Sequence, residues 1–366
     1  MANASADIVI DGGEKSGSGT IVRMAVALAA LTGRSLRLYN IRARRAKPGL
    51  AHQHLTAIEA VREVCGGTLD GATVGSREIL FRPGPDVRGG SYRWAIGTAG
   101  STTMLALCLL PVTAYASGPC VCRVEGGLFQ DFAPSFFHFQ RVLLPALRRM
   151  GLSAEATMHR PGYVPRGGGV IEVRVEPVRA ALRPLALAER RGRPRLRGVA
   201  LASRLAERRV AERMAARCND VLRGQGYAAE FDIVNDTSSP QPGAALALFA
   251  EYENGCVLGA DQAGAPGRAS EAIGEHVARA LLEDIGTGAT VDRHLADQLI
   301  VFAALADGVS EFVLPAVTDH VESNLWLVER FLGVRTELLG QRLRVTGAGY
   351  VRRQAHESLD PRADGS

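Results

Sequence analysis

One order of elements occurs three times along the chain, and this repetition constrains its fold more than any other feature. In each segment an apolar helix precedes a strand, a polar loop leads into a second helix, and two strands follow. The first unit has helices 20–31 and 52–64 and strands 36–41, 68–74 and 78–82; the second has helices 101–116 and 134–150 and strands 120–124, 153–159 and 170–175; the third has helices 291–306 and 321–331 and strands 311–314, 334–338 and 342–345. Three such units predict an α+β protein with an internal repeat.

The second and third units are separated by about a hundred residues that carry their own strand and helix signals. We therefore predict a discontinuous main domain, residues 1–181 and 287–350, interrupted by a smaller α/β insert at 182–286 and followed by a C-terminal tail at 351–366. The insert opens with the basic run Glu189 to Arg197, for which a solvated charged face is the simpler interpretation and RNA docking the alternative.

The composition is that of a soluble globular protein, with 46% hydrophobic and 22% charged residues. The chain starts without a signal-peptide pattern, and its longest apolar stretch, 103–116, is too short to cross a membrane. Six cysteines without a Cys-x-x-Cys pair predict reduced core thiols. We therefore predict a cytoplasmic protein with no membrane partner.

The net charge of +5 leans toward polyanions but is too small to establish nucleic-acid binding. Only Lys15 and Lys47 are lysines among 43 basic residues, a bias that indicates genome composition more than a binding code. The placement of the arginines is more informative, because Arg42, Arg44 and Arg45 crowd one loop between a predicted strand and helix.

The loop 315–320 carries His320 where a predicted strand gives way to a predicted helix. Unpaired N–H groups at a helix N-terminus favour an anion such as phosphate, and a neutral imidazole is nucleophilic near neutral pH. A satisfied structural histidine is the alternative reading. The equivalent loops of the other units are 42–53 and 125–134, and packing about a pseudo-threefold axis would bring three helix N-termini to one phosphate-binding cleft. The loop 125–134 is apolar at Leu128, Phe129 and Phe132, so an ordinary connection is the alternative there.

Three motifs common in nucleotide binding or nucleotidyl transfer are missing. The glycine-rich segment 11–20 lacks the spacing of a P-loop or of a dinucleotide-binding turn. No Lys-x-Asp-Gly sequence surrounds Lys15 or Lys47, so histidine is the better candidate if the chain adenylates itself. His52 and His54 are interpreted as residues at a helix start and not as a metal site.

Several segments, in order, resemble the RNA 3′-terminal phosphate cyclase family over nearly the whole chain. The matching segments are Ile41 to Leu50 with Gln53-His-Leu55, Phe81-Arg-Pro-Gly84, Arg88-Gly-Gly90, Gly97-Thr-Ala-Gly-Ser101, Gly162 to Gly169, Gly259 to Glu271, His294-Leu-Ala-Asp-Gln298, and Thr318-Asp-His320 with Asn324. The resemblance implies a main domain of three βαβαββ-type units with an inserted α/β domain. It also implies an ATP-dependent reaction that converts an RNA 3′-phosphate into a 2′,3′-cyclic end, with a divalent metal ion, magnesium or manganese.

The resemblance further assigns roles to individual residues. His320 would form a covalent histidine-linked AMP, which would then pass to the RNA 3′-phosphate. Arg23, Arg42 and Arg45 would grip phosphate oxygens with the help of Gln53. The nucleotide site would comprise Pro134, His294, Leu295, Ala296, Asp297 and Gln298, with Pro134 and His294 on the two faces of adenine and Asp297 orienting His320.

This chain departs from the family pattern at several positions. Ser16 stands where a metal-linked glutamate is expected, with Glu14 two residues earlier, so no metal ligands are assigned. Leu107 replaces a glutamine of the ATP pocket, Gly126-Gly-Leu-Phe129 replaces Gly-Gly-Thr-Asp/Glu, and Arg44 replaces a small residue. A noncatalytic relative that binds RNA or assists ribosome assembly is the second hypothesis, and an enolpyruvyl transferase is a third. The sequence predicts no oligomeric state.

Overall fold

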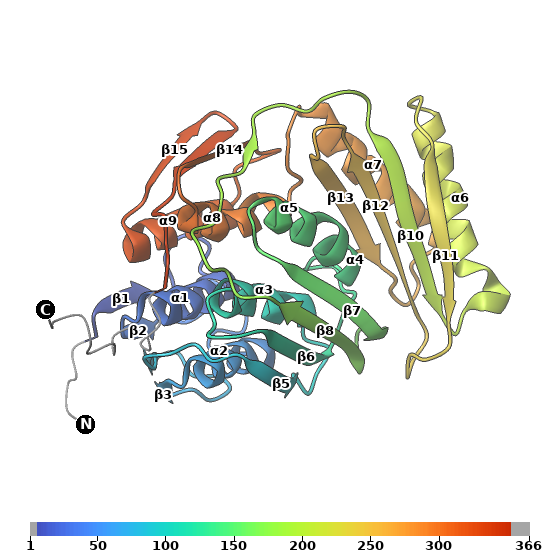
Figure 1. Cartoon of the computed structure of the whole chain (residues 1–366). Coiled ribbons are helices and arrows are strands. Elements are labelled where there is room, and N and C mark those ends of the chain that lie inside the picture. The colour runs from blue at the N-terminus through green and yellow to red at the C-terminus, as the bar shows by residue number, and fades with distance from the viewer. Residues whose placement is uncertain (1–5, 353–366) are drawn as a thin grey trace, which may run out of the picture.

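Three four-stranded sheets repeat one strand order in the computed structural model, which describes residues 6–352 (Figure 1). In each sheet the first two strands are parallel and the other two pair antiparallel. The orders are β1 (Ile8–Asp11), β2 (Leu36–Tyr39), β4 (Ile79–Arg82), β3 (Thr68–Asp70); β5 (Gly90–Ala95), β6 (Cys120–Gly126), β8 (Gly169–Val175), β7 (Ala154–Arg160); and β9 (Ala186–Leu187), β14 (Val309–Val313), β16 (Arg342–Thr346), β15 (Arg335–Leu339). The α+β fold of three βαβαββ units is confirmed.

The helices of the three units pack against one another between the sheets (Figure 1). The first crossovers are α1 (Gly19–Thr32), α3 (Thr102–Thr113) and α8 (Leu295–Leu305); the second are α2 (His52–Cys65), the helical run 136–149 and α9 (Asp319–Leu332). Helix α1 lies at the centre, in contact with α2, α3 and α9. All its residues except Thr32 are buried, which explains its nearly continuous apolar sequence.

The caps of α1 fix where the helix begins and ends. The Ser18 side chain accepts a hydrogen bond from the Thr20 N–H, and Gly33 closes the helix at a φ of 68°, which favours glycine. The helical run 136–149 is less regular, with α4 (Phe136–His138), a π-helical turn (Phe139–Leu143) and α5 (Leu144–Arg149). Pro145 has no N–H to donate to the preceding turn, which accounts for the change in hydrogen bonding.

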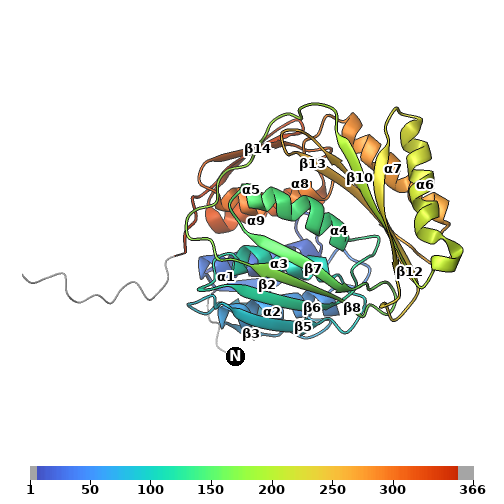
Figure 2. The ribbon, with the colours of Figure 1, turned by 45° about the vertical axis from the view of Figure 1, so that its right-hand side comes forward.

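The insert forms the fourth sheet, in the order β11 (Ala229–Asp236), β10 (Arg195–Ser203), β12 (Gly243–Glu251), β13 (Val257–Ala263). Helices α6 (Val210–Arg223) and α7 (Ser270–Gly286) cover one face of it (Figure 2), and a short 3₁₀ turn (Ala206–Arg208) precedes α6. Strand β13 contacts α4, so the insert packs against the second unit.

Strand β9 bears on the predicted start of the insert. Strand β9 lies within the range 182–286 assigned to the insert, yet it pairs with β14 in the third sheet. Two residues are too few to show a strand pattern in the sequence. The basic run that follows them indicates the opening of the insert, so the predicted boundary falls before β9. The division into domains at 181 and 287 stays a prediction, and the predicted tail from residue 353 onward lies outside the described residues.

Three other expectations concern the surface and the core. The arginines 190, 191, 193, 195 and 197 each contact a carboxylate, a hydroxyl or a carbonyl oxygen within the insert, as a solvated charged face would. The six cysteines are free and buried. Within residues 6–352, none of the helices combines the length and the apolar character needed to cross a membrane.

Candidate active site

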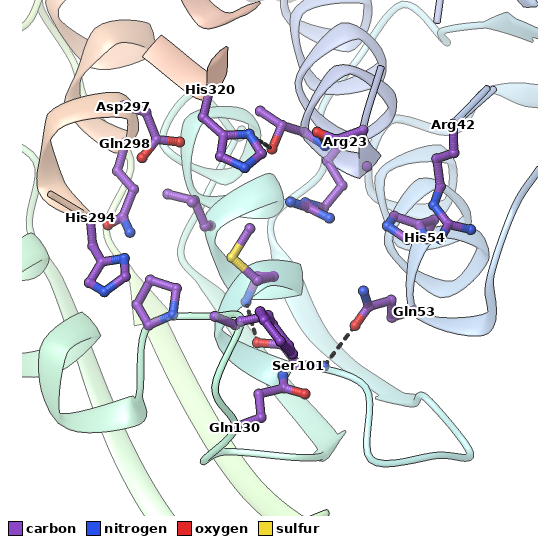
Figure 3. A pocket seen from close by; sticks show the side chains of 18 of the residues that line it. Arg23, Arg42, Gln53, His54, Ser101, Gln130, His294, Asp297, Gln298 and His320 are labelled. Atoms are coloured by element: carbon purple, nitrogen blue, oxygen red, sulfur yellow. Dashed lines mark hydrogen bonds between the residues drawn. The ribbon is translucent and has the colours of Figure 1, made fainter. Parts of the chain in front are cut away.

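A cavity of about 410 Å³ lies where the N-termini of five helices meet (Figure 3). The start of α1 contributes Thr20, the start of α2 contributes Gln53, the cap of α3 contributes Ser101, the cap of α8 contributes His294, and the first turn of α9 contributes His320. Unpaired N–H groups and the aligned peptide dipoles make such a convergence electropositive. The site is therefore suited to a polyphosphate.

Most of the predicted site residues line this cavity. They are Arg23, Arg42, Arg45, Gln53, Pro134, His294, Asp297, Gln298 and His320. Leu295 and Ala296 do not, because they are buried in the hydrophobic core, at 2% and 1% exposure, on the inward side of α8. Their place in a matching motif predicted that they contact the nucleotide. Successive residues of a helix point in different directions, so their neighbours Asp297 and Gln298 line the cavity instead.

His320 is the second residue of α9, whose cap is Thr318. Its Nδ1 lies 3.1 Å from the Thr20 Oγ1. If Nδ1 carries the proton, the Thr20 hydroxyl accepts it and Nε2 keeps its lone pair. Burial, together with the charges of Arg23 and Arg45, lowers the pKa of His320. The side chain is thus a neutral imidazole at physiological pH, oriented by α1 and available as a nucleophile. The family resemblance implied that Asp297 orients His320, but the hydrogen bond goes to Thr20.

Arg23 projects into the cavity from α1, and only 5% of the residue is exposed. Its Nε has no hydrogen-bond partner, and no ion pair with Arg23 occurs among residues 6–352. Burial, with Arg42 and Arg45 nearby, lowers the pKa of Arg23 to about 10, so the group stays charged. An uncompensated buried cation is costly in the free protein, and an anionic ligand would relieve that cost.

Arg42 and Arg45 line the same cavity as Arg23, from the loop between β2 and α2. Arg42 has a left-handed φ of 54°, and its Nη1 donates to the Gly49 carbonyl oxygen at 2.7 Å. This bond fixes the guanidinium at the cavity wall. Burial and the charge of Arg45 lower the pKa of Arg42. The three arginines are close enough to repel one another, and an anion bound between them would offset that repulsion.

His54 also lines the cavity, although its sequence position indicated only a helix start. It is 3% exposed, and burial lowers its pKa to about 2, so the ring is neutral. Helix α1 approaches it closely: a Cβ at position 19 would lie 2.0 Å from the His54 Nε2. Gly19 is therefore required for the contact that packs His54 against the start of α1.

Asp297 and Gln298 occupy the first turn of α8 and face the cavity opposite Arg42 (Figure 3). Burial raises the pKa of Asp297 to about 7. At neutral pH the carboxyl group is therefore protonated about half of the time and repels a phosphate less than an ordinary aspartate would. Asn324 Nδ2 donates to the Asp297 carbonyl oxygen at 2.8 Å, which ties α9 to α8.

A buried ion pair between His138 and Asp292 holds His294 in position. The His138 Nε2 lies 3.0 Å from both carboxylate oxygens of Asp292, and both side chains are fully buried. Asp292 Oδ1 also accepts the His294 and Leu295 N–H groups. The rings of His138 and His294 meet edge to face at 5.5 Å. The pair thus fixes the start of α8 and the His294 ring, and burial lowers the pKa of His294 so that this ring is neutral.

Replacing Asp292 with asparagine should lower the free energy of unfolding by about 3 kcal/mol, since breaking a buried pair leaves one charge uncompensated. Both carboxylate oxygens accept backbone N–H groups, Oδ1 from His294 and Oδ2 from Gly259. The NH₂ group of an asparagine would therefore face one of these N–H donors. Burial opposes ionisation of Asp292, yet His138 holds its pKa at about 2; burial also opposes the charge on His138, yet Asp292 raises its pKa.

The sign of the pH dependence follows from these shifts. The depressed Asp292 pKa contributes stability above about pH 3.9, its unfolded value, and the raised His138 pKa contributes stability below about pH 6.5. Denaturant unfolding should therefore show the largest difference between wild type and Asp292→Asn from about pH 4 to pH 6.5. Asp220→Asn, at an exposed pair with Arg223, is the control and should change little. A difference that grows above pH 7 would contradict this account.

The departures from the family pattern have definite places. Leu107 lines the cavity beside Met104 and Pro134, giving one wall an apolar surface. Ser16 joins a hydroxyl chain with Ser18 and Ser323, at 2.9 and 2.8 Å. Leu128 is buried in the core, and Arg44 turns to the Lys15 carbonyl oxygen, outside the cavity lining.

Some lining residues were not predicted as site residues. They are Ser18, Gly19, Thr20, His54, Ser101, Met104, Gln130, Phe132 and Ala133. His54 had a usable signal, because it lies inside the matching segment Gln53-His-Leu55. Thr20 had none, since its partner His320 is 300 positions away.

The family model for RNA 3′-terminal phosphate cyclases matches residues 14–338. Proteins named RNA 3′-terminal phosphate cyclase are similar to this chain. Those of Methanopyrus kandleri, Methanothermobacter thermautotrophicus and Nitrosospira multiformis are 38, 40 and 39% identical, over 91, 92 and 90% of this chain and 96, 97 and 92% of their own lengths. A solved structure, the enolpyruvyl transferase NikO from Streptomyces tendae, has a TM-score of 0.27 and 13% identity over 94% of this chain and 52% of its own, which is too weak a likeness to assign function. The chain belongs to the RNA 3′-terminal phosphate cyclase family.

Proposed function

We propose that this protein uses ATP to convert the 3′-phosphate of an RNA into a 2′,3′-cyclic phosphodiester through a covalent AMP on His320. The observation that carries the proposal is a neutral, oriented imidazole facing three arginines at five helix N-termini. Membership of a family whose named members are cyclases supports the substrate and the overall reaction.

The first step would place AMP on the protein. The His320 Nε2 attacks the α-phosphorus of ATP, the N–P bond forms, and the bond to the bridging oxygen of the β-phosphate breaks, releasing pyrophosphate. Arg23 and the helix N-termini stabilise the charge that develops on the phosphate oxygens. The neutral His294 ring and Pro134 would hold adenine, with the apolar surface of Leu107 beside them.

The next two steps would close the ring. An oxygen of the RNA 3′-phosphate attacks the AMP phosphorus and frees His320, and the neighbouring 2′-hydroxyl oxygen then attacks the activated phosphorus. AMP leaves, and the hydroxyl proton passes to solvent. Arg42 and Arg45 grip the RNA phosphate so that the hydroxyl is in line, which makes closure effectively unimolecular. The need for a 2′-hydroxyl selects an RNA end.

The residues present do not form a dedicated metal site. In the part of the chain that the structure describes, no three side chains of His, Cys, Asp or Glu are grouped to hold a metal ion. Glu14 is exposed and does not line the cavity, and burial raises the pKa of Asp297 to about 7, so its carboxyl group is only partly ionised at neutral pH. Magnesium is often held largely by substrate phosphates and water. The proposed steps therefore do not depend on a protein-bound metal.

Removal of the Thr20 hydroxyl tests how His320 is oriented. Thr20→Val should slow self-adenylation by about tenfold, because the imidazole loses the partner that fixes its tautomer and direction. Thr20→Ser, which keeps the hydroxyl, should restore the rate. The measurement is single-turnover transfer of label from α-labelled ATP to protein. Equal rates for the valine and serine variants would remove Thr20 from this role.

The proposed reaction is tested with an RNA carrying a labelled 3′-terminal phosphate. Incubation with ATP and magnesium or manganese should make the label resistant to phosphatase, with one AMP released per cyclic end. Ser16 and Leu107 favour the alternative of a noncatalytic RNA-binding or ribosome-assembly protein. That alternative predicts RNA binding with no cyclic product and no labelled protein.

A further inference from the structure

A second cavity, of about 540 Å³, lies between the loop 162–168 and the N-terminus of α7. None of its lining residues lines the first cavity. Its floor is apolar, with Val164, Pro165, Pro242 and Pro266, and arginines stand around it. A pocket with an apolar floor and a cationic rim is suited to a nucleotide, which has a flat base and a charged phosphate.

Two of the arginines that line the cavity are free to bind a ligand. Arg166 and Arg208 are exposed, and the side chain of neither forms a hydrogen bond or ion pair with another residue in the range 6–352. The other two are already paired: Arg213 holds Glu271 at 2.7 and 2.8 Å, and Arg268 holds Asp131 at the same distances. The nearby carboxylates are thus neutralised, and two positive charges remain for an anion.

The N-terminus of α7 adds a phosphate-sized donor set. Its cap, Ala269, has no side chain to satisfy the first N–H groups of this 17-residue helix. The first residue of the helix, Ser270, lines the cavity and is 7% exposed, and its hydroxyl forms no hydrogen bond with any residue of the described part. A hydroxyl without a partner on a residue that is more than nine-tenths buried, beside unpaired N–H groups, points to a ligand in that position.

The loop 128–134 forms a wall between the two cavities, because it lines the first and contacts residues that line the second. Its Leu128 N–H donates to the Gly162 carbonyl oxygen at 2.8 Å, the Phe129 ring stacks on the Tyr163 ring at 5.4 Å, and Asp131 holds Arg268. Tyr163 and Arg268 line the second cavity, whereas Phe132 and Ala133 line the first. Phe132 is fully exposed, an unusual position for a large aromatic side chain.

We propose that the second cavity binds an upstream nucleotide of the RNA strand whose 3′-phosphate lies in the first cavity. This inference rests on the proposed function. The strand crosses the loop 128–134, where Phe132 stacks on a base. An upstream phosphate then meets Ser270, the N-terminus of α7, Arg166 and Arg208, and its base packs on Val164, Pro165 and Pro242. The basic run 190–197 is a weaker candidate because its arginines are paired within the insert.

The test compares binding of a labelled ten-nucleotide RNA with that of a dinucleotide, both carrying 3′-phosphates, by fluorescence anisotropy. The double variant Arg166→Ala/Arg208→Ala should bind the longer RNA about tenfold more weakly and the dinucleotide as wild type does. The slope of log affinity against log salt should become less steep by about 0.7, the value for one neutralised phosphate on a single strand. Phe132→Ala should also weaken the longer RNA by about tenfold, from lost stacking.

The matched control is Arg223→Ala/Arg279→Ala, which removes the same charge from α6 and α7 away from the cavity. It should change neither affinity. Equal effects of the two double variants, or equal losses with both RNA lengths, would overturn the proposal. Displacement of the longer RNA from this cavity by free 5′-AMP, with no dependence on RNA length, would assign the cavity to a mononucleotide instead and would also overturn it.

These outcomes are independent of the catalytic proposal. Binding is measured without ATP, and self-adenylation of the Arg166→Ala/Arg208→Ala variant should equal that of wild type. A protein that adenylates itself and cyclises the dinucleotide but shows no length-dependent loss would contradict only the second-cavity inference. A protein that shows the loss but never adenylates would contradict only the proposed reaction.

Discussion

His320→Asn is expected to lower the rate of RNA cyclisation by about 10⁴-fold or more, the scale of loss when an enzyme loses its nucleophile. The asparagine amide cannot attack phosphorus, whereas the arginines and helix N-termini that hold the triphosphate remain. ATP binding by calorimetry should therefore stay within a few fold of wild type. The rate is measured from phosphatase-resistant label at saturating ATP and RNA.

His52→Asn is the matched control, because His52 is an exposed histidine at the start of α2 and does not line the cavity. It should retain the wild-type rate. Cyclisation by the His320→Asn variant at a rate close to wild type would show that another group attacks ATP.

Arg23→Met should reduce cyclisation by about 10³-fold, since an arginine that stabilises phosphoryl charge contributes on that scale. The same change should leave the free energy of unfolding equal to or higher than that of wild type. Arg23 is buried without an ion-pair partner among residues 6–352, and methionine fills similar volume without a charge to desolvate. The two effects have opposite signs because the charge is present for the ligand and not for the fold.

Denaturant unfolding of the ligand-free protein, paired with the cyclisation assay, measures both effects. Arg23→Lys separates charge from geometry: it should keep the cost of a buried cation and lose most of the activity, because an ammonium cannot bind phosphate in a bidentate manner. Loss of several kcal/mol of stability in Arg23→Met with activity retained would mean that Arg23 serves the fold.

The helices and inner strands of the fold could be predicted from sequence because their burial follows a regular period. Helix α1 is apolar almost throughout, and the predicted range 20–31 is close to the observed Gly19–Thr32. The first strands of the second and third units had no such signal. Strand β5 buries only Trp94, and β9 has two residues, so neither shows an alternation that sequence reading could detect.

The site could be predicted in part for a similar reason. Arginines in a strand-to-helix loop and a histidine at a helix start have a local signature, and Arg42, Arg45 and His320 line one cavity. Leu295 and Ala296 shared a motif with real lining residues but face the core, because a helix turns successive residues in different directions. The partners of His320 and Ser16, Thr20 and Ser323, are about 300 positions away, so only the folded chain brings them together.

In the proposed mechanism a single imidazole carries AMP before the RNA end is changed, and peptide mapping tests this step most directly. The protein is incubated with ATP and a divalent cation without RNA, digested at neutral pH, and examined by tandem mass spectrometry. We predict AMP on the peptide that contains His320, and its loss when RNA with a 3′-phosphate is added. AMP attached to Lys15 or Lys47, or cyclic product formed with no protein adduct at any time, would contradict the account.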